Sequence, residues 1–395
     1  GAELCGRSAL CRRARRLHAD AGMAPRLPAL TAHTRLTFLA CRAGASGHEV
    51  TSHRGVAQRL ASLMDCTFEE ARDDAVPASG PAGYMVPNET IGTLDGARAL
   101  GIQGEGDLFG GVVRHLFVAT KTITHPLVGR DAAAPEGWRA ELAERVRDVV
   151  LPGLSTYTLD DARAAGRRLL RDGPVRLKLA SGAGGSGQSV AHDETQLEAQ
   201  LAALDPAGLA SHGLVIERNL AEVRTHSIGL IRLGSLVASY HGIQRTTRNR
   251  HGHEVYGGSS LEVVRCGLDE LERMTADAAV RHAIGQARVY HAAALECFAG
   301  MYASRCNYDV AQGCDAAGRA CSGVLEQSWR IGGASGAEVA ALEALRDDPA
   351  LDRVRASTVE AHGAGVAVPE GATLYYAGLD EHLGPITKYA TLDRR

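Results

Sequence analysis

The chain has 395 residues, of which 45% are hydrophobic and 23% are charged, and its formal net charge at pH 7 is −3. These values are typical of a soluble globular protein with more than one unit, and they exclude the strong basic excess of most nucleic-acid-binding proteins. No apolar run approaches the roughly 18 residues that a membrane-spanning helix needs. We therefore expect neither nucleic acid nor a membrane as a partner.

The cysteines and lysines give two further indications, one about the redox compartment and one about candidate functional residues. The nine cysteines form no C-x-x-C pair, which predicts reduced thiols in a cytoplasmic protein. Only Lys121, Lys178 and Lys388 are lysines, and the other 40 of the 43 basic residues are arginine. We expect the surviving lysines at positions that need a compact ammonium group rather than a guanidinium fork.

The N-terminal third predicts a small α/β layer. Residues 1–29 are rich in arginine near their start and are expected to be a disordered or added extension, with a targeting peptide as the alternative. Strands alternate with helices after it. The predicted elements are a strand at 35–41, a helix at 52–64 with Ser52 as its N-cap, a strand at 83–87 and a helix at 93–100 capped by Thr93.

The rest of the chain continues the alternation. A polar, glycine-rich segment at 245–260 separates its two halves. The predicted helices are 136–149, Thr158 to 170, 193–204, 270–297 and 336–346. The predicted strands are 175–180, 213–218, 222–231, 235–241, 302–311, 322–328, 372–377 and 385–390.

The strongest local signal is a lysine at the end of a strand, followed by a loop of small residues. Lys178 precedes the sequence GAGGSG at residues 182–187. Glycines allow the backbone N–H groups to approach phosphate oxygens, and the ammonium group suits phosphate charge. The order G-x-x-x-x-G-K-[ST] of a Walker loop is absent, and so is the helix start of a Rossmann fingerprint. A plain hairpin linker remains the alternative.

Two carboxylates form the second signal. Asp309 and Glu326 are expected at matching levels on adjacent strands, facing the same side. Paired acids are costly without a cation or hydrogen bonds, and hard oxygen ligands near a phosphate site indicate Mg²⁺. The alternative is a pair of solvated strand acids. A third and weaker signal is ERNLAE at 217–222, which follows an apolar strand and could face adenine and ribose, although a surface turn is the stronger alternative for this segment alone.

In this order the motifs resemble the ATP-grasp superfamily. Its members carry a lysine, a second lysine with a glycine-rich loop, an E-x-x-L linker, a metal-binding acid and an E-x-x-x-R motif. The counterparts here are Lys121, Lys178 with GAGGSG, residues 217–220, Asp309 and residues 326–330. The segments QGEGDLFGG, ATKTITHPLV and SGVLEQSWRIGGASG also look like an uncharacterised bacterial family within the superfamily.

The resemblance spans residues 115 to about 335 and implies a fold and its units. The fold class is α/β with α+β elements, an ATP-grasp fold preceded by a small Rossmann-like domain. The implied units are residues 30–115 for the preceding domain, 116–210 for the N-terminal subdomain with the lid, and 211–395 for the C-terminal subdomain with the metal site.

The resemblance also implies ATP and Mg²⁺ as cofactors and assigns roles. Lys121 and Lys178 would bind the α- and β-phosphates, and Arg330 would face the transferred phosphate. Arg245, with Arg248 and Arg250 as alternatives, is a candidate for a catalytic cation in a region where some members have a lysine. Nucleotide contacts are further implied for Gly182, Gly184, Gly185, Ser186, Gly187, Glu217, Arg218, Leu220 and Glu222. Metal contacts are implied for Asp309, Glu326 and Ser328, although Ser328 stands where the family usually has asparagine, which puts a second Mg²⁺ in doubt.

The function implied is an ADP-forming ligase that joins a carboxylate to an amine through an acyl phosphate, with both substrates small molecules. Residues 331–336 (IGGASG) could cradle the substrate carboxylate or form a plain tight turn. Bicarbonate activation, as in biotin carboxylase, is one alternative, and a regulatory protein that binds ATP but turns it over weakly is another. The chain could also form a homodimer.

Overall fold

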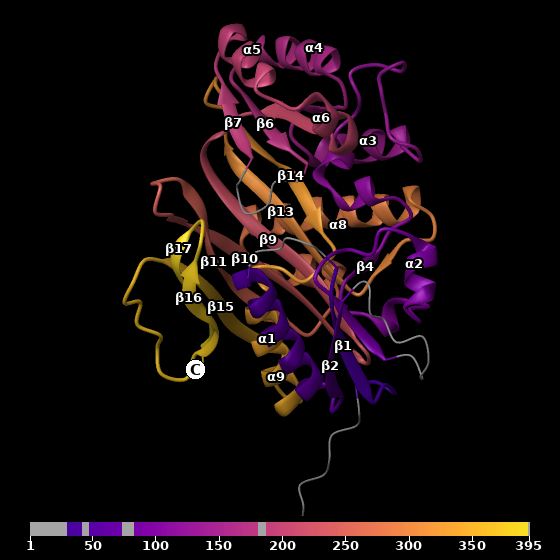
Figure 1. The fold of residues 1–395 in the computed structure, drawn as a ribbon, viewed down its shortest axis with the longest axis vertical. Coiled ribbons are helices and arrows are strands. Elements are labelled where there is room, and N and C mark those ends of the chain that lie inside the picture. The colour runs from indigo at the N-terminus through magenta and orange to yellow at the C-terminus, as the bar shows by residue number, and fades with distance from the viewer. Residues whose placement is uncertain (1–29, 42–46, 73–82, 181–186, 394–395) are drawn as a thin grey trace, which may run out of the picture.

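The computed structural model describes residues 30–41, 47–72, 83–180 and 187–393. Helices and strands alternate along the chain and build sheets of three, four, eight and two strands (Figure 1). The α/β class expected from the sequence is confirmed. Within the described residues, no helix combines the length and the apolar character needed to cross a membrane.

The first sheet is small and parallel. Its central strand β1 (Arg35–Ala40) pairs with β2 (Thr67–Arg72) on one side and β3 (Tyr84–Pro87) on the other. Helix α1 (Gly47–Leu63) covers this sheet with apolar residues of its last three turns. The predicted start of α1 at Ser52 is wrong, because the Ser52 hydroxyl lies inside the helix and donates to the His48 carbonyl at 2.7 Å.

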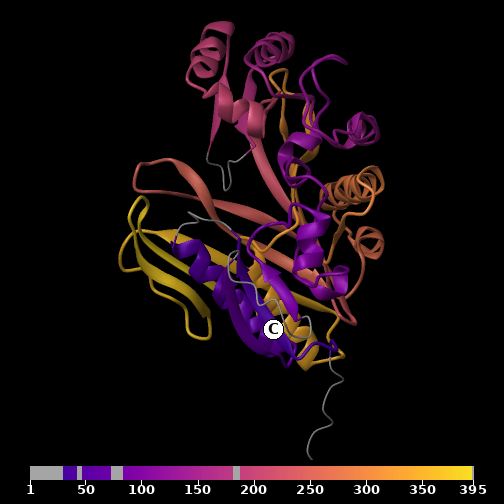
Figure 2. The same cartoon turned by 45° about the vertical axis from the view of Figure 1, so that its right-hand side comes forward.

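The four-stranded sheet is antiparallel and forms one end of the molecule, together with two helices (Figures 1 and 2). Its order is β5 (Gly153–Thr156), β8 (Leu214–Arg218), β6 (Val175–Leu179) and β7 (Gln188–Ala191). Because β8 lies between β5 and β6, it belongs to the same hydrogen-bonded unit. We therefore propose that the boundary between the second and third units follows β8 rather than residue 210.

Helices α4 (Leu159–Leu170) and α5 (Glu194–Ala202) pack on this sheet through a core of small and branched apolar residues. Their starts agree with the sequence, since the side chains of Thr158 and Asp193 accept hydrogen bonds from backbone N–H groups of the first turn. A short helix, α6 (Pro206–His212), leads into β8.

The eight-stranded antiparallel sheet forms the body of the molecule. Its order is β14 (Ala320–Ser328), β13 (Arg305–Cys314), β9 (Ala221–Leu233), β10 (Leu236–Arg248), β11 (Glu254–Val264), β15 (Arg353–His362), β17 (Gly384–Asp393) and β16 (Thr373–Asp380). The polar segment predicted at 245–260 is mostly strand, because β10 from Ser239 onward pairs with β11, with one register shift after Arg245. Strand β15 was not predicted.

Helices cover both faces of this sheet. On β9, Ile228 and Leu230 belong to the core under α8 (Ala278–Cys297), and Ile231 and Leu233 belong to the core under α1 and α9 (Ser335–Asp347). The long helix predicted at 270–297 is in fact two. The first, α7, is Leu268–Met274, and Asp277 caps the start of α8 by accepting from Ala279 and Val280.

Short elements connect these layers. They are α2 (Leu94–Ala99), α3 (Ala140–Val146), the two-stranded sheet of β4 (Gly111–Val112) and β12 (Tyr302–Ala303), and the 3₁₀ helices η1 (Glu105–Asp107), η2 (Leu116–Ala119), η3 (Lys121–Thr124) and η4 (Arg147–Val149).

Candidate functional site

One cleft of about 1540 Å³ brings together most of the residues that the sequence singled out. Its lining includes Lys121, Lys178, Asp309, Glu326 and Arg330. These side chains come from η3, the four-stranded sheet, the β13–β14 edge of the eight-stranded sheet and the turn before α9. Helix α1 and the strands β15 and β17 line the same cleft.

A buried charge cluster lies in the wall formed by the four-stranded sheet. The Lys178 Nζ is 2.5 Å from Oε1 of Glu217, and His125 Nε2 is 3.1 Å from the other carboxylate oxygen. All three side chains are 5% exposed or less. Burial raises the pKa of Glu217, but Lys178 and then His125 outweigh burial and hold it at about 2. Glu217 is therefore ionised, and Lys178 has a fixed anionic partner.

His125 was not picked out from the sequence. It lies 92 positions before Glu217 and follows η3, and the two meet only because residues 126–127 run beside β5. A single histidine in the segment TKTITHP belongs to no motif that predicts a contact with Glu217. The sequence feature that could have identified His125 is its position four residues after Lys121, in a segment already assigned to the site.

The glycine-rich loop is described only at its end. Gly182, Gly184, Gly185 and Ser186 lie outside the described residues. Gly187 has a left-handed φ of +68°, a conformation that favours glycine. Its carbonyl accepts from the Leu179 N–H at 3.0 Å and closes the β6–β7 hairpin. The role of this loop over phosphates stays a prediction.

The predicted adenine linker follows β8. Arg218 and Leu220 line the cleft, and Leu220 is buried. The guanidinium of Arg218 lies 3.7 Å from Asp172 and 3.8 Å from Asp315. Glu222 is exposed, has a left-handed φ of +53° at the start of β9, and is not part of the cleft lining. The structure therefore does not bring Glu222 to the cleft.

Asp309 and Glu326 are register partners on β13 and β14, as the sequence indicated. Gln244 and Asn307 each donate a side-chain N–H to Oδ1 of Asp309, at 2.7 and 2.8 Å. Burial, followed by the nearby charge of Glu326, raises the pKa of Asp309 to about 6. These two acids therefore repel each other, and a cation would relieve that repulsion.

The ammonium group of Lys121 supplies positive charge beside this acid pair. Its Nζ lies 2.8 Å from Oε2 of Glu326, and its side chain is only 4% exposed. The lysine expected to bind phosphate is thus placed directly beside the predicted metal pair. Both functions need the same small region of the cleft, so the geometry brings the phosphate and metal candidates together.

Ser328 lines the cleft with the two acids, and its metal role stays a prediction. Its hydroxyl accepts from Arg305 at 3.4 Å, and its Cα partner on the neighbouring strand is Asn307. The amide that the family usually carries on β14 thus has a counterpart on β13, where Asn307 contacts Asp309 directly. The sequence reasoning missed Asn307, although it stands two residues before the predicted metal ligand.

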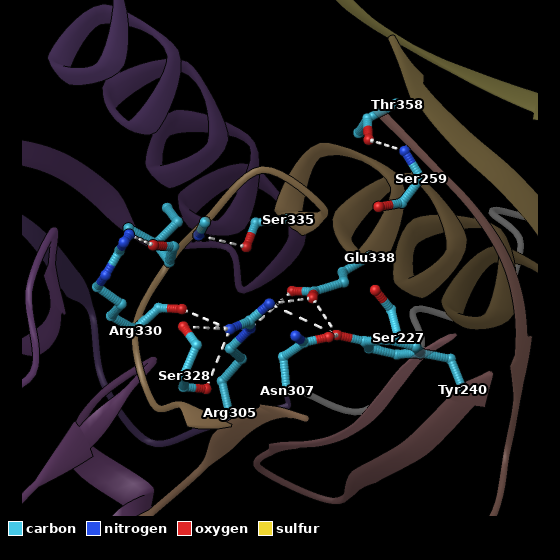
Figure 3. Close-up of polar contacts among 12 residues, drawn as sticks. Ser227, Tyr240, Ser259, Arg305, Asn307, Ser328, Arg330, Ser335, Glu338 and Thr358 are labelled. Atoms are coloured by element: carbon cyan, nitrogen blue, oxygen red, sulfur yellow. Dashed lines mark hydrogen bonds and ion pairs between the residues drawn. The ribbon is translucent and has the colours of Figure 1, made fainter. Parts of the chain in front are cut away.

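A buried ion pair between Arg305 and Glu338 lies next to the site residues Asn307 and Arg330 (Figure 3). Arg305 on β13 donates to both carboxylate oxygens of Glu338 on α9, at 3.1 and 2.5 Å. The Tyr240 hydroxyl lies 2.7 Å from Glu338 and 2.9 Å from Asn307. Arg305 also donates to the Arg330 carbonyl at 2.6 Å. This network fixes the strand ends that carry the site, and removal of either charge would leave the other buried and unpaired.

The predicted catalytic arginines both line the cleft. Arg330 donates to the Ile331 carbonyl at 2.9 Å, and its Nε lies 3.4 Å from Glu89. Its side chain extends away from the Arg305 network (Figure 3). Arg245 on β10 donates to the Thr358 carbonyl at 3.2 Å. After Arg330, a tight turn at 332–335 leads into α9, with Gly332 and Ser335 bonded to each other at 3.0 Å.

Comparison with known protein families identifies one family that matches most of the chain. The sequence pattern of a family described as "Protein of unknown function (DUF3182)" matches residues 38–390. The chain belongs to this DUF3182 family. No curated protein matches the sequence.

Solved structures give the fold of the DUF3182 chain. It is similar to the phosphoribosylamine–glycine ligase of Thermotoga maritima, with a TM-score of 0.51, 13% identity and coverage of 91% and 92% of the two chains. It is also similar to N5-carboxyaminoimidazole synthetase of Staphylococcus aureus in complex with ADP, with a TM-score of 0.50, 11% identity and coverage of 93% and 96%.

A third similar structure is the biotin carboxylase domain of the Hydrogenobacter thermophilus 2-oxoglutarate carboxylase, which holds MgADP and bicarbonate. Its TM-score is 0.50, with 14% identity and coverage of 91% and 86%. The fold is therefore the ATP-grasp fold, as the order of the sequence motifs indicated.

Proposed function

We propose that the protein is an ATP-dependent, ADP-forming ligase that activates a carboxylate as an acyl phosphate and transfers it to an amine. The observation that carries this proposal is the cross-strand pair of Asp309 and Glu326, which lies in one cleft with Lys121, Lys178 and Arg330. An ATP-grasp fold places such a pair beside the nucleotide, and all three cations suit a reaction in which phosphate charge moves.

The acid pair fits Mg²⁺. Both ligands are carboxylates, the donors that this ion prefers. Burial and then the charge of Glu326 raise the pKa of Asp309, and a divalent cation would stabilise its ionised form. Among the described residues, no three His, Cys, Asp or Glu side chains are placed to hold a metal. Two carboxylates leave coordination positions for water and phosphate oxygens, as Mg²⁺ sites in phosphoryl-transfer enzymes usually do. The ion would supply charge neutralisation on the phosphates.

The nucleotide fits the wall of the cleft made by the four-stranded sheet. Lys121 and Lys178 would contact phosphate oxygens, and their partners Glu326 and Glu217 hold them in place. Leu220 offers an apolar surface for adenine next to the backbone of residues 217–220. The chain supplies these groups from three separate elements, so the site forms only in the folded protein.

The chemistry needs positioning and charge stabilisation more than a protein nucleophile. The substrate carboxylate oxygen attacks the γ-phosphorus, and the bond from that phosphorus to the ADP oxygen breaks. The amine nitrogen then attacks the acyl carbon, inorganic phosphate leaves, and the amine proton passes to phosphate or solvent. Arg330 would stabilise the transferring group, and the backbone N–H groups of Gly333 and Ala334, which line the cleft, would orient the carboxylate.

Cys306 lies beside the site but does not enter this scheme. It is fully buried, and burial raises the pKa of its thiol to about 12. Such a thiol stays protonated and is not a nucleophile at neutral pH. The absence of a role for Cys306 agrees with a reaction that passes through an acyl phosphate rather than an acyl enzyme.

The test is ADP release from MgATP with pools of carboxylates and amines, with hydroxylamine added to trap an acyl phosphate as a hydroxamate. We expect ADP release that depends on a carboxylate, with hydroxamate formed in equal amount. Bicarbonate is tested in a separate reaction, because carboxyphosphate chemistry would give ADP with bicarbonate alone. Steady ADP release without hydroxamate or product from any carboxylate would overturn the ligase proposal in favour of a regulatory ATP-binding protein.

A further inference from the structure

Three histidines at the far end of the cleft have buried nitrogen atoms without hydrogen-bond partners. They are His48 and His53 on α1 and His362 at the end of β15, and all three line the cleft. Nine buried side-chain nitrogen or oxygen atoms of the described residues lack a partner, and four of them belong to these histidines. An unpartnered buried polar atom costs free energy, so four in one place indicate a ligand.

Charged groups of both signs surround these histidines. Lys388 on β17 is one of only three lysines, and its Nζ lies 2.8 Å from Oε2 of Glu360, its register partner on β15. The Nε2 of His362 is 3.7 Å from the other oxygen of Glu360. At the end of β16, Oδ2 of Asp380 is 3.9 Å from Nε2 of His48. We call His48, His53, Glu360, His362, Asp380 and Lys388 the histidine end of the cleft.

The histidine end is not placed to hold a metal. Within the described part of the chain, no group of three His, Cys, Asp or Glu side chains has the arrangement of a metal site. Burial lowers the pKa of both His48 and His53, with the charge of Lys388 adding to the effect. Neutral imidazoles offer one donor and one acceptor each, which suits an organic ligand that carries both kinds of group.

The histidine end is also separate from the phosphate and metal residues. Four strand spacings of the eight-stranded sheet lie between β13, which carries Asp309, and β15, which carries Glu360, a span of roughly 19 Å for strands about 4.8 Å apart. His53 bridges part of this distance, since the charges of Arg330 and Lys388 both act on it. A ligand at the histidine end therefore leaves the positions beside Asp309 and Lys121 free for the nucleotide and the metal ion.

We propose that the histidine end binds a head group that carries both an ammonium and a carboxylate, at the remote end of the carboxylate substrate. The carboxylate of this head group would accept from Lys388 and from the histidine nitrogens that carry a proton. Its ammonium would donate to Asp380 and Glu360. The substrate is then an elongated amino acid whose side-chain carboxylate reacts near Arg330. The assignment of the reacting end rests on the ligase function proposed above, whereas the binding of the head group does not.

Three probes of matched chain length test this proposal by calorimetry on the protein saturated with MgADP. 2-Aminoadipate carries both head-group charges, adipate lacks the ammonium, and 5-aminopentanoate lacks the head-group carboxylate. We expect 2-aminoadipate to bind at least about tenfold more tightly than either analogue, the scale of one lost hydrogen bond to a charged group. Equal affinity for all three probes, or no binding of any, would overturn the proposal, and ordered water would then account for the histidine nitrogens.

Variants assign each half of the head group. Asp380→Asn should remove the preference of 2-aminoadipate over adipate, and Lys388→Met should remove its preference over 5-aminopentanoate. His362→Gln, which keeps a donor and an acceptor, should weaken binding less than His362→Ala.

His192→Asn is the matched control, because His192 is exposed and outside the cleft lining. Circular dichroism of each variant separates lost binding from lost folding. A folded Asp380→Asn variant that keeps the full preference for 2-aminoadipate over adipate contradicts the assignment.

Activity separates the two proposals. Binding of 2-aminoadipate, with no hydroxamate from it or from any other carboxylate of the pool, would support the head-group site and overturn the ligase function. Hydroxamate formed equally well from adipate and 2-aminoadipate would keep the ligase function and remove the head-group site. Hydroxamate formed from 2-aminoadipate with a KM at least about tenfold below that of adipate would support both.

Discussion

Lys178 and Glu217 lie diagonally across two antiparallel strands, with the ammonium nitrogen 2.5 Å from one carboxylate oxygen. The register pairs Arg176, not Lys178, with Glu217, so the contact is made between side chains two positions apart on the same face. His125 holds the second carboxylate oxygen from a separate segment. This arrangement keeps a charged lysine fixed in the cleft wall before any ligand binds.

We predict that Lys178→Ala weakens ATP binding by about 1.5–3 kcal/mol, the scale of a lost hydrogen bond to a charged group. The ammonium supplies charge to the phosphates, and alanine leaves Glu217 as an unopposed negative charge in the same wall. Isothermal calorimetry with MgATP measures the change. Arg98→Ala is the control, because Arg98 is exposed on α2 and away from the cleft lining. Equal ATP affinity in the wild type and Lys178→Ala would sink the nucleotide assignment.

Glu217→Gln should destabilise the fold by about 3–5 kcal/mol, because it leaves Lys178 buried without an anionic partner. The pH dependence gives a second readout. The folded pKa of Glu217, about 2, lies below its ordinary value near 4.5. Its contribution to stability is therefore present above pH 4.5 and is lost as the pH falls towards 2.

Urea unfolding at several pH values tests this sign. The difference in free energy of unfolding between wild type and Glu217→Gln should be constant from pH 7 to 5 and shrink below about pH 4.5. A difference that stays constant down to pH 2.5 would show that the ionised carboxylate does not stabilise the fold.

Local elements were largely predictable, because their signals lie in neighbouring residues. The caps Thr93 and Thr158 and the strand pair around the turn at 315–319 follow the sequence patterns. The extension of β10 and the strand β11 were missed, because glycine and charged residues in 245–260 hide a strand that its neighbours hold by backbone bonds. Strand β15 was missed for a similar reason, since alternating arginines and small residues give it little apolar character.

The candidate site was predictable where motif and strand register coincide. Asp309 and Glu326 met as expected because a short turn sets the register of β13 and β14. Contacts between distant segments were not predictable. Arg305 and Glu338 meet through a strand and a helix, and His125 meets Glu217 through separate loops and strands. A single sequence records the residue types at such positions but not which of them the fold brings together.

Asp309→Asn is expected to abolish turnover and, without Mg²⁺, to stabilise the protein. Burial and the charge of Glu326 raise the pKa of Asp309, so its ionised form destabilises the folded state at pH 7. Asparagine keeps the oxygen that accepts from Gln244 and Asn307 and removes the charge. The gain should be on the order of 1–3 kcal/mol.

Thermal unfolding with and without Mg²⁺ measures this change in stability. A concentration of about 10 mM saturates weak Mg²⁺ sites. Wild type should be stabilised by Mg²⁺ and the Asp309→Asn variant should not respond. Asp131→Asn, at an exposed turn position, serves as the control. A variant that is less stable than wild type in the absence of Mg²⁺ would show that the two acids are not in conflict.

The last prediction concerns Arg330, which lies directly between the metal pair and the turn at 332–335 along the chain. Glu326, Arg330 and residues of this turn all line the cleft, so the proposed metal ligand, a cation and backbone donors would be available to one transferring group. Because the arginine charge is needed mainly as the phosphoryl group moves, its loss should affect the transition state more than the bound nucleotide.

Arg330→Ala should lower turnover by about 10²-fold or more and weaken ATP binding by less than about tenfold. Steady-state ADP release and MgATP calorimetry on the same preparation separate the two effects, with Arg171→Ala on the exposed end of α4 as control. If Arg330→Ala lost ATP affinity and turnover in equal measure, Arg330 would be a nucleotide-binding residue, and stabilisation of the transferring group would have to come from Arg245 or the two lysines.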